Sequence, residues 1–598
     1  MSTPLATDLL LLHAPSVYDF REKSILYGPV SDMVPSSTVF EMYPIGFLTL
    51  LSYLEERGWR VRIVNLALRM MNDSRFDVRQ FLAEQAAPQA VGIDLHWLPH
   101  AHGALEVARL AKEVYPQAPV IMGGLSSTYF HRELVGYPQV DFVLRGDSTE
   151  APLHQLLTTL RAGGSVASIA NLTWKDSKGA VQVNPHAYVP NTLDYVDVRP
   201  ELLIEMVLRY RDVRSVLPFN GWWRNPITMV LPLKGCAYEC VTCGSSHTTC
   251  THLTRRSRPV FRSPENLVAN VRNISRISRG PIVIPGDLLQ GGEPYARAVL
   301  EGLRAADIAN ELVFELFDLP PAGYLSEIDR CVPNWSFEIS PESHEHDVRI
   351  AQEGEPGYDN AAFEAFLLEA LTSRCHRIDV FFMIGLPGQT YQSVLDTVEY
   401  CGRLFELGDR RLNCFISPMG PFVDPGSRIF EQPERFGYRL FAHTLEEHRQ
   451  LLVQPSWEQI LNYETRWMSR AQLVDATYDA AERLNLLKLR YGRVSRHQAR
   501  AVSDRIAEAR RLRELLRQQG DALDSPAAQD LRGEINRFSV STVCDKSELA
   551  WPTHAVNFHP LGILRSALAG RRTLVARTRA RAAADDGTPA GPAPAKQS

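Results

Sequence analysis

The sequence predicts an α/β protein in which two regions of alternating strands and helices are followed by a mainly helical region. Two observations predict this class. Short apolar segments of strand length alternate with amphipathic segments of helix length over two long stretches, about residues 1–165 and 226–430. The spacing between successive strands leaves room for a crossover helix, which parallel strands require. From about residue 431 the helical period dominates.

The composition is that of a large globular protein. With 598 residues, 45% of them hydrophobic, the chain is long enough for two or three domains with their own cores. A net charge of −5 gives no electrostatic reason to expect nucleic acid or an anionic membrane as a partner. The longest apolar runs, such as Leu9–Leu12 and Val380–Ile384, are too short to span a bilayer. Asp8 stands where a secretory signal would be basic, so we expect a cytoplasmic location.

The first region is predicted to form a parallel sheet. Its expected strands are Asp8–His13, Val61–Asn65, Ala90–Leu95, Val120–Met122 and Asp141–Leu144, and its expected helices are Pro44–Arg57, Phe76–Glu84, Ala104–Val114 and Pro152–Leu160. Polar or glycine-rich turns follow the strands. Because ligands of such sheets bind beyond the carboxyl ends of the strands, we expect a binding site at these turns.

The second region is predicted to form a partial (β/α) barrel. Its six expected strands are Thr228–Leu233, Ile282–Ile284, Leu312–Phe317, Ser336–Ile339, Asp379–Ile384 and Asn413–Ile416. The sequence thus predicts five segments: a first domain at 1–165, a connector at 166–225, the barrel at 226–430, a mainly helical domain at 431–577 and a tail at 578–598. The tail is rich in Ala, Pro and Gly, which predicts disorder.

The cysteines indicate one metal site in a reducing compartment. None of the nine precedes Cys236, and Cys236, Cys240 and Cys243 then form a C-x3-C-x2-C motif on the loop after a strand. Iron–sulfur clusters and structural zinc sites usually take four protein ligands. Three thiolates would leave one iron of a [4Fe-4S] cluster open for a substrate. With Cys250 as a fourth ligand, the alternative is a zinc site or a closed cluster.

This motif resembles that of the radical S-adenosylmethionine (SAM) family, in which SAM binds the open iron. Later segments resemble the family's SAM-binding strand ends in the same order, although Thr242 stands where the family often has an aromatic residue. The resemblance implies that SAM contacts lie in Gly286-Asp287, in the segment Phe337–Ser343 with the following helix, and in Gly385-Leu386-Pro387-Gly388. The implied SAM-binding residues are Gly286, Asp287, Ser340, Ser343, Arg349, Gly385 and Pro387.

The first region resembles the cobalamin-binding domain that is fused to many radical SAM enzymes. The resembling segments are Tyr43–Gly46, Val120–Gly124 and Asp141–Asp147, and the whole resemblance covers about the first 430 residues. A nucleotide-binding Rossmann domain is disfavoured, because His13-Ala14-Pro15 follows the first strand instead of G-x-G-x-x-G. The implied cobalamin-binding residues are Arg69, Asp94, His96, Gly123, Gly124, Ser126, Ser127, Gly146 and Asp147.

The resemblance also bears on how cobalt is held. Asp94-Leu95-His96 imitates the start of the Asp-x-His-x-x-Gly motif of mutases, but Pro99 stands where its glycine would be. We therefore expect cobalamin without a protein histidine ligand. Arg69 is then expected to face the lower side of cobalt, as a non-ligating arginine does in a related tryptophan methyltransferase.

The resemblance implies a cobalamin-dependent methyltransferase that uses a [4Fe-4S] cluster, cobalamin (as methylcobalamin) and SAM. The expected acceptor is an sp2 carbon of a heteroaromatic ring, of pyrrole or indole type, in antibiotic biosynthesis. Glu338, Glu342 and Tyr463 are candidates for the base that removes the ring proton. Aromatic residues near the C-terminus are candidates to cover the site: Tyr463, Trp467, Trp551, His554 and Phe558. Flavodoxin or ferredoxin is the expected electron donor.

Two other functions stay open. Some cobalamin-dependent radical SAM relatives close or contract rings without methyl transfer. A non-catalytic cobalamin-dependent regulator is the alternative from another class, although a sensor would need only the first domain. No cysteine precedes Cys236, which excludes the methylthiotransferases, whose additional cluster needs three N-terminal cysteines.

Overall fold

Five consecutive buried residues, Leu9–His13, form strand β1, an inner strand of the N-terminal sheet. In the computed structural model, which describes residues 6–29, 37–352, 357–519, 526–538, 544–551, 554 and 556–568, β1 pairs in parallel with both neighbours. The order of the seven-stranded sheet is β2-β1-β3-β4-β5-β6-β7. The other strands are β2 (Val61–Asn65), β3 (Ala90–Asp94), β4 (Val120–Gly123), β5 (Phe142–Leu144), β6 (Leu172–Lys175) and β7 (Val181–Val183).

Helices cover both faces of this sheet, which explains why its inner strands are continuous apolar runs. The helices α1 and α7 lie with α8 on one face, where Leu9 and Leu11 join their core. On the other face, Leu10 and Leu12 pack toward α3 and α4. The helices of this half are α1 (Gly46–Glu56), α2 (Leu66–Asn72), α3 (Val78–Ala83), α4 (Ala101–Val114), α5 (Leu125–Tyr129), α6 (His131–Gly136), α7 (Glu150–Arg161) and α8 (Glu201–Tyr210).

The segment 166–225, expected as a connector, contributes to the first sheet. Strand β6 pairs in antiparallel fashion with β5, β7 pairs in antiparallel fashion with β6, and α8 packs on the face of the sheet. These strands are only four and three residues long and carry polar side chains such as Thr173 and Gln182. Their weak alternation is the reason that the sequence pattern does not reveal them.

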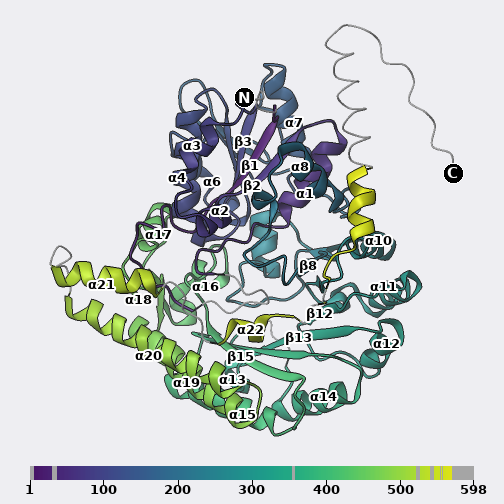
Figure 1. Cartoon of the computed structure of the whole chain (residues 1–598), viewed down its shortest axis with the longest axis vertical. Coiled ribbons are helices and arrows are strands. Elements are labelled where there is room, and N and C mark those ends of the chain that lie inside the picture. Colours follow the sequence, from purple (N-terminus) through teal and green to yellow (C-terminus); the bar gives the residue numbers. More distant parts are fainter. Residues whose placement is uncertain are drawn as a thin grey trace.

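The second sheet has six parallel strands in the order β15-β14-β13-β12-β11-β8. Neighbouring strands of this sheet follow one another along the chain, as in a partial (β/α) barrel. Between β8 and β11 the chain also forms β9 and β10, which belong to a separate small sheet. The strands are β8 (Thr228–Met229), β11 (Ile282–Ile284), β12 (Leu312–Leu316), β13 (Trp335–Glu342), β14 (Ile378–Ile384) and β15 (Leu412–Pro418). Figure 1 shows this sheet below the N-terminal one.

The predicted strand Thr228–Leu233 is broken in two. Only β8 joins the barrel, whereas β9 (Leu233–Lys234) pairs in antiparallel fashion with β10 (Val260–Phe261). Pro232 lies between the two strands and has no N–H to donate to a sheet, which accounts for the break. The strand β9 leads directly into the three-cysteine motif.

Helices pack on the outside of the barrel, and several short helices lie in its loops. The barrel helices are α10 (Pro264–Ser275), α11 (Glu293–Ala306), α12 (Tyr324–Cys331), α14 (Asn360–Thr372) and α15 (Tyr391–Phe405). The short helices are α9 (His247–Thr249), the π-helical turn η3 (Cys250–Thr254), the 3-10 turn η4 (Leu288–Gly291) and α13 (His346–Ile350). Remaining short turns are η1 (Leu98–His100), η2 (Arg214–Val216) and η5 (Pro433–Phe436).

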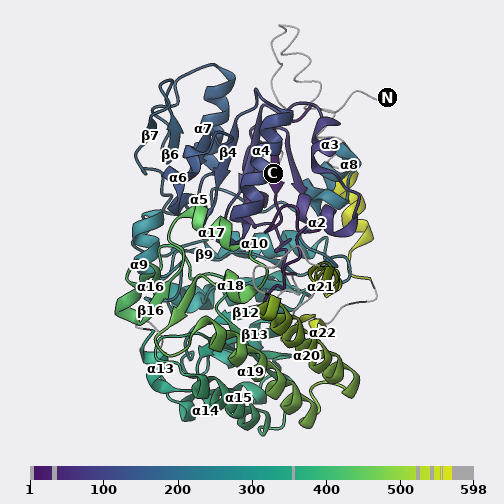
Figure 2. The ribbon, with the colours of Figure 1, turned by 90° about the vertical axis from the view of Figure 1, so that its left-hand side faces the viewer.

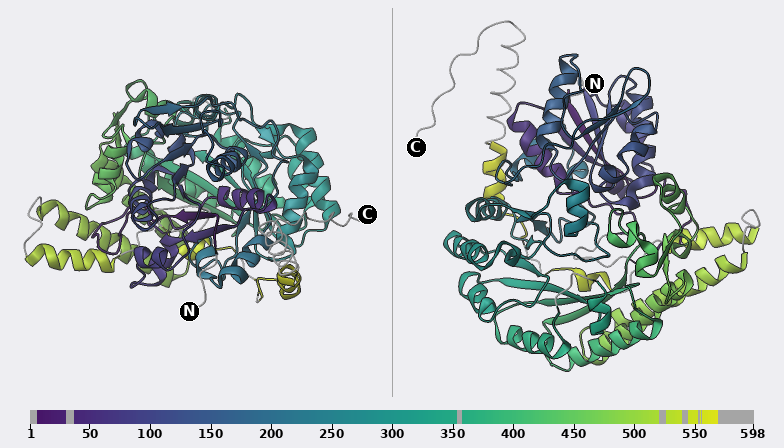
Figure 3. Two further views of the ribbon diagram at one scale, coloured as in Figure 1. Left: turned by 90° about the horizontal axis from the view of Figure 1, so that it is seen from above. Right: turned by 180° about the vertical axis from the view of Figure 1, so that it is seen from behind.

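The C-terminal region is mainly helical, and its long helices stack against the barrel. The helix α19 contacts α15, and α20 contacts α19 (Figure 2). From behind, α20 and α21 extend to one side of the barrel (Figure 3, right). The elements are α16 (Arg428–Glu431), β16 (Tyr438–Leu440), α17 (Leu445–Leu451), α18 (Trp457–Ile460), β17 (Tyr463–Thr465), α19 (Arg470–Arg490), α20 (Arg496–Gln519), α21 (Pro526–Arg537), α22 (Lys546–Leu549) and a helix at 560–568.

Two expectations about the whole chain can be set beside the structure. Within the described ranges, no helix is both long and apolar enough to cross a membrane. The tail predicted to be disordered, 578–598, lies outside the described residues.

Candidate functional site

The three-cysteine motif follows β9 on a loop at the carboxyl-terminal edge of the barrel. Gly235, with φ of +86°, makes the turn into it. Cys236, Cys240 and Cys243 are partly exposed, whereas the other six cysteines are buried. Backbone N–H groups donate to two of these sulfurs, from Tyr238 to Cys236 at 3.5 Å and from Ser245 to Cys243 at 3.3 Å. Such donors would stabilise a metal-bound thiolate, whereas in the metal-free chain burial outweighs them at Cys243 and raises the pKa of its thiol.

Three loops of the barrel hold the cysteine loop in place. Gln290 accepts a hydrogen bond from the Ala237 N–H through its side chain at 2.8 Å. The Gln352 carbonyl oxygen accepts from Val241 at 3.0 Å, and an Asp424 carboxylate oxygen accepts from Gly244 at 3.1 Å. Sequence reasoning missed all three residues. No local signal identifies them, because they lie between 53 and 180 residues from their partners on the loop.

The cysteines are not committed to disulfides. All nine cysteines lie in the described part of the chain, and none is in a disulfide. Among the described residues, no group of three His, Cys, Asp or Glu side chains converges as one ion would require. A zinc ion gathers its ligands around one point, whereas a [4Fe-4S] cluster spreads its thiolates over separate irons. The Cys250 thiol donates to the Ser245 carbonyl oxygen at 3.2 Å.

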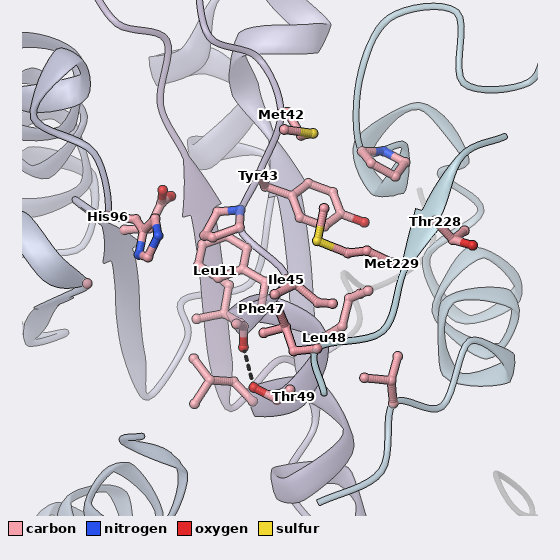
Figure 4. Close-up of a pocket in the computed structure, with 18 of the residues that line it drawn as sticks. Leu11, Met42, Tyr43, Ile45, Phe47, Leu48, Thr49, His96, Thr228 and Met229 are labelled. Carbon is pink, nitrogen blue, oxygen red and sulfur yellow. Dashed lines mark hydrogen bonds between the residues drawn. The ribbon is translucent and has the colours of Figure 1, made fainter. Parts of the chain in front are cut away.

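A cavity of about 810 Å³ lies between the N-terminal sheet and the barrel. Its walls come from the carboxyl ends of β3, β4 and β5, from α1 and α8, and from the loop before the cysteines. Figure 4 shows apolar side chains reaching it from both halves of the chain, with Leu11 and Tyr43 from the first and Met229 from the second. The predicted residues Asp94, His96, Gly123, Gly124, Gly146 and Asp147 line this cavity, together with Lys234 and Gly235.

A buried ion pair fixes one end of the cavity. The His13 Nδ1 lies 2.9 Å from an Asp94 carboxylate oxygen, and His13 Nε2 donates to the Phe40 carbonyl oxygen at 3.1 Å. Burial alone would lower the pKa of His13, but Asp94 outweighs it and raises this pKa. Burial would likewise raise the pKa of Asp94, but His13 lowers it. Asp94 therefore pairs with His13 of the neighbouring strand β1.

His96 enters the cavity, where its ring lies 6.0 Å from that of Trp97. Its backbone is held by Gly124, whose φ is +117°. A Cβ on Gly124 would lie 2.6 Å from the Cα of His96, so only glycine fits here. Burial lowers the pKa of His96, which keeps its imidazole neutral.

Three predicted cobalamin residues do not line the cavity. Arg69 is paired with Asp212 at 3.0 Å and stacks over Phe76 and Phe81, so the prediction that it faces cobalt is not supported. Ser126 and Ser127 donate to the carbonyl oxygens of His96 and Gly123, both at 3.1 Å. These hydroxyls thus hold the turn after β4 and do not reach the cavity lining.

The turn after β11, which contains Gly286 and Asp287, lies beside the cysteine loop. The Gly286 N–H donates to Glu315 of β12 at 2.6 Å. Asp287 accepts from the Leu289 N–H at 2.8 Å, and burial raises its pKa to about 6. The short turn η4 then carries Gln290 to the cysteine loop. Glu315 was missed because its partner lies 29 residues away on another strand.

The predicted SAM-binding residues at and after the end of β13 have different surroundings. A register shift between Ile339 and Glu342 interrupts the pairing of β13 with β14, and Glu342 has a φ of +60°. Ser340 lies in this irregular segment and is partly exposed. The buried Ser343 hydroxyl accepts from the Glu345 N–H at 3.1 Å. Arg349 donates to Asn360 at 3.0 Å, so this contact directs it toward α14.

Glu338 lies on the inner face of the barrel. The ring of its neighbour Phe337 packs 5.6 Å from Phe366 of the outer helix α14, and side chains alternate along a strand. Its register partners on the same face are Glu315 and Asp379. The structure therefore brings carboxylates together inside the barrel.

The hydroxyl of Tyr463 is engaged by a backbone carbonyl oxygen and not by the carboxylates inside the barrel. Its side chain is fully buried, and its hydroxyl donates to the Met419 carbonyl oxygen at 2.8 Å. A Cβ on Gly385 would lie 2.7 Å from the hydroxyl oxygen of Tyr463, and Gly385 has a φ of +99°. Tyr463 thus shapes the turn that contains Gly385 and the buried Pro387, which corrects its interpretation as a base.

The C-terminal aromatic residues divide into two groups. Trp551 packs inside the barrel with Val283 and Val313, near the amino ends of the strands. Phe558 instead meets Trp222 and Trp223 at 5.3 and 5.2 Å and lines the cavity. Trp467 packs against Gly437, and His554 is exposed. The residues expected to cover the site are Tyr463, Trp467, Trp551, His554 and Phe558. Of these five described residues, only Phe558 lines the cavity.

A segment at 556–568 carries Phe558 across the mouth of the cavity; we call it the C-terminal strap. The Arg279 N–H donates to the Asn557 carbonyl oxygen at 2.8 Å, and the His559 N–H donates to Ile277 at 2.9 Å. Gly562 approaches closely enough that a Cβ would lie 2.0 Å from the Arg276 carbonyl oxygen. Ile563 and Ala567 also line the cavity, so the strap is part of its wall.

Comparison with known proteins identifies the first domain. Residues 33–154 match the family model of the B12 binding domain. The chain is 24% identical over 277 residues to the cytidylyl-2-hydroxyethylphosphonate methyltransferase of Streptomyces wedmorensis, covering 39% of this chain and 50% of that enzyme. It is 23% identical over 206 residues to the anaerobic magnesium-protoporphyrin IX monomethyl ester cyclase of Synechocystis, covering 34% of this chain and 38% of the cyclase. The chain thus matches half or less of the length of these relatives.

Two solved structures share the fold over most of the chain. One is the radical SAM methyltransferase TsrM from Kitasatospora setae with cobalamin and a [4Fe-4S] cluster bound, with a TM-score of 0.55, 17% identity and coverage of 81% of this chain and 89% of TsrM. The other is the cobalamin-dependent radical SAM enzyme OxsB, with a TM-score of 0.51, 14% identity and coverage of 97% and 81%. The predicted α/β fold and cobalamin-binding domain are confirmed.

The His13–Asp94 pair predicts a pH-dependent stability. Asp94→Asn leaves a buried charge without its partner, so we expect a loss of about 3 kcal/mol in the free energy of unfolding. Because the pKa of His13 is raised by folding, its contribution to the free energy of unfolding is complete below the pKa of the unfolded chain and is lost as pH rises through the folded pKa. Because the pKa of Asp94 is lowered by folding, the contribution of Asp94 is lost as pH falls through its folded pKa. Urea unfolding should show the largest deficit near neutral to mildly acidic pH. An equal deficit at alkaline pH, or none relative to the exposed Asp504→Asn, would contradict the pair's role.

Phe558→Ala is predicted to open the mouth of the cavity. Removing the ring takes away its contacts with Trp222 and Trp223 and exposes apolar lining. We expect tighter binding of a fluorescent apolar probe such as bis-ANS, measured by titration at equal protein concentration. Leu561→Ala is the control, because Leu561 lies on the same strap but is 68% exposed. Equal probe binding by both variants would argue that the strap does not close the cavity.

Proposed function

We propose that this chain is a cobalamin-dependent radical SAM methyltransferase that transfers a methyl group from SAM to carbon. The observation that carries the proposal is the joint position of the cavity and the cysteine loop. Gly235 lines the cavity and directly precedes Cys236, so both cofactors would meet in one space. When bound, cobalamin would supply a methyl-carrying cobalt and the cluster an iron that holds SAM and delivers electrons. The protein would position these groups and exclude water.

The residues of the cavity fit cobalamin. An apolar cavity at the carboxyl ends of parallel strands is the usual place for a ligand of this sheet type. Gly123 and Gly124 allow close backbone approach, and His96 offers a ring that burial keeps neutral. We propose that Asp94, Gly146 and Asp147 act by shaping the cavity, since Asp94 and Asp147 are already engaged by His13 and Arg256.

The cysteine loop fits a cluster with one open iron. Cys236, Cys240 and Cys243 are partly exposed and share a loop held by Gln290, Gln352 and Asp424, whereas the buried Cys250 is bonded to a backbone carbonyl. We propose that the three are the ligands and that Cys250 is not. The turns at Gly286-Asp287 and Gly385-Pro387, with Ser340, Ser343 and Arg349, stay proposed contacts for SAM.

We further propose a heteroaromatic acceptor, methylated on an sp2 carbon in antibiotic biosynthesis. The fold similarity to TsrM, whose structure is also known with tryptophan and a SAM analogue, supports this choice. Glu338 is the proposed base, because it lies on the inner face of the barrel beside Glu315. Glu342 is the second candidate. Flavodoxin or ferredoxin is the proposed electron donor.

Removing each proposed ligand separates the open cluster from a four-ligand site. In Cys236→Ala, Cys240→Ala and Cys243→Ala we expect loss of nearly all bound iron after anaerobic reconstitution, because each thiolate holds a separate iron. Cys250→Ala is the matched control and should keep the wild-type iron content. Iron and sulfide analysis with visible absorbance provides the measurement. Loss of iron in Cys250→Ala would favour the closed site.

Product analysis tests the reaction itself. The reconstituted protein is supplied with a reductant, SAM carrying a deuterated methyl group, and a panel of indoles and pyrroles. We expect S-adenosylhomocysteine and a heteroaromatic product carrying the label, both detected by mass spectrometry. Ring closure without label in the product would instead support the cyclase alternative, which the similarity to the magnesium-protoporphyrin ester cyclase favours. Cobalamin binding without SAM cleavage would support the regulator.

A further inference from the structure

A basic segment, Arg255-Arg256-Ser257-Arg258, borders the cysteine loop and is not explained by the cavity. It packs directly on Gly235: a Cβ there would lie 3.4 Å from the Arg258 carbonyl oxygen. His247 ties the segment to the loop as well, since its Nε2 donates to the Ser257 carbonyl oxygen at 3.1 Å and its Nδ1 contacts Glu239 at 2.7 Å. The basic segment therefore contacts the cysteine loop at Gly235, directly before Cys236, and at His247, shortly after Cys243.

More cations face this segment from the first domain. The helix α5 contacts η3, which Arg255 terminates, and α6 follows α5 with His131 and Arg132. Arg145 at the end of β5 is 8% exposed and donates to the Asn184 carbonyl oxygen. Burial, together with Arg132 and Arg255, lowers the pKa of Arg145 to about 10, so these three cations lie close together. We call Arg132, Arg145 and Arg255, together with the exposed Arg258 three residues further along the chain, the cationic face.

The cationic face keeps its charge uncompensated within the described structure. Arg145 has no carboxylate partner there, and its Nε has no hydrogen-bonding partner. The carboxylates nearby are engaged elsewhere: Asp147 with Arg256, Glu239 with His247, and Glu133 with the Leu445 N–H. Converging like charges destabilise the fold unless a partner compensates them. In a chain of net charge −5, this local excess points to an acidic partner.

We propose that the cationic face docks an acidic electron-donor protein of the flavodoxin type. The proposal rests on the proposed function, because it is the cluster that needs electrons. One electron would leave the donor's flavin hydroquinone, giving the semiquinone, and reduce the cluster on the adjacent loop by one electron. Electron-transfer complexes are small and depend on complementary charge for fast encounter. Arg132, Arg255 and Arg258 are exposed and would make the contacts, with Arg145 behind them.

Charge reversal with a matched control tests the docking. The full-length variant Arg132→Glu/Arg255→Glu/Arg258→Glu is compared with Arg304→Glu/Arg403→Glu/Arg500→Glu, which makes the same charge change at exposed sites on α11, α15 and α20. The dissociation constant for a bacterial flavodoxin is measured at low and high salt, with circular dichroism as the folding check. We expect the first variant alone to bind about tenfold more weakly at low salt and to lose the salt dependence.

Two further readouts keep this proposal separate from the proposed function. Reduction of the reconstituted protein by methyl viologen radical cation, a small reductant that needs no docking, should be equally fast in both variants. If both variants bind flavodoxin with the same affinity, whether unchanged or weakened to the same extent, the cationic face is not the docking surface. Absence of iron from the wild type would overturn the proposed function, while the binding constants would still decide the docking surface.

Discussion

The ion pair between Arg256 and Asp147 sets the position of the candidate site. Arg256 follows the cysteine loop, and Asp147 follows strand β5 of the B12-binding domain. The guanidinium donates to both carboxylate oxygens, to Ser148 at 3.2 Å and to the Pro190 carbonyl oxygen at 2.8 Å. Such forked, charge-assisted contacts fix orientation as well as distance. Lys234 adds contacts to Asp147 and Ser148 from the start of the same loop.

This junction explains why one cavity serves both halves of the molecule. Because the cysteine loop is clamped to the end of β5, the turns after β3, β4 and β5 face the barrel opening and not solvent. The connector and the C-terminal strap then close the space with Trp222, Trp223 and Phe558. Chain segments separated by more than 300 residues thus meet around one cavity, and the strap gives the C-terminal region a role near the site.

The sequence was sufficient for the parts of the fold that depend on local periodicity. Buried parallel strands such as Leu9–His13 and the barrel strands have continuous apolar runs, so their existence could be predicted. Strand β6, with its polar residues, could not, and Pro232 broke a strand that apolar composition alone favoured. The three cysteines could be recognised because their spacing is local. Gln290, Gln352 and Asp424 could not, because folding alone brings them to the loop.

Side-chain roles were less predictable than positions. Arg69 stands after β2, near the correct edge of the sheet, but Asp212 and two phenylalanines hold it away from the cavity. Tyr463 lies beside the Gly385 turn, yet its hydroxyl is committed to a backbone oxygen. Asp94 was expected only as a cobalamin-binding residue, and its carboxylate pairs with His13. In each case the decisive partner lies in a distant segment, which no local motif encodes.

We propose that the cavity and the cysteine loop hold two cofactors in one space. The most direct test is the magnetic interaction between them in the reconstituted full-length protein. With cobalamin as cob(II)alamin and the cluster reduced, both are paramagnetic, and electron paramagnetic resonance reports their separation. The account predicts about four irons and one cobalamin per chain, with spectra that show coupled spins. Two independent, uncoupled signals, or a chain that binds zinc in place of iron, would contradict it.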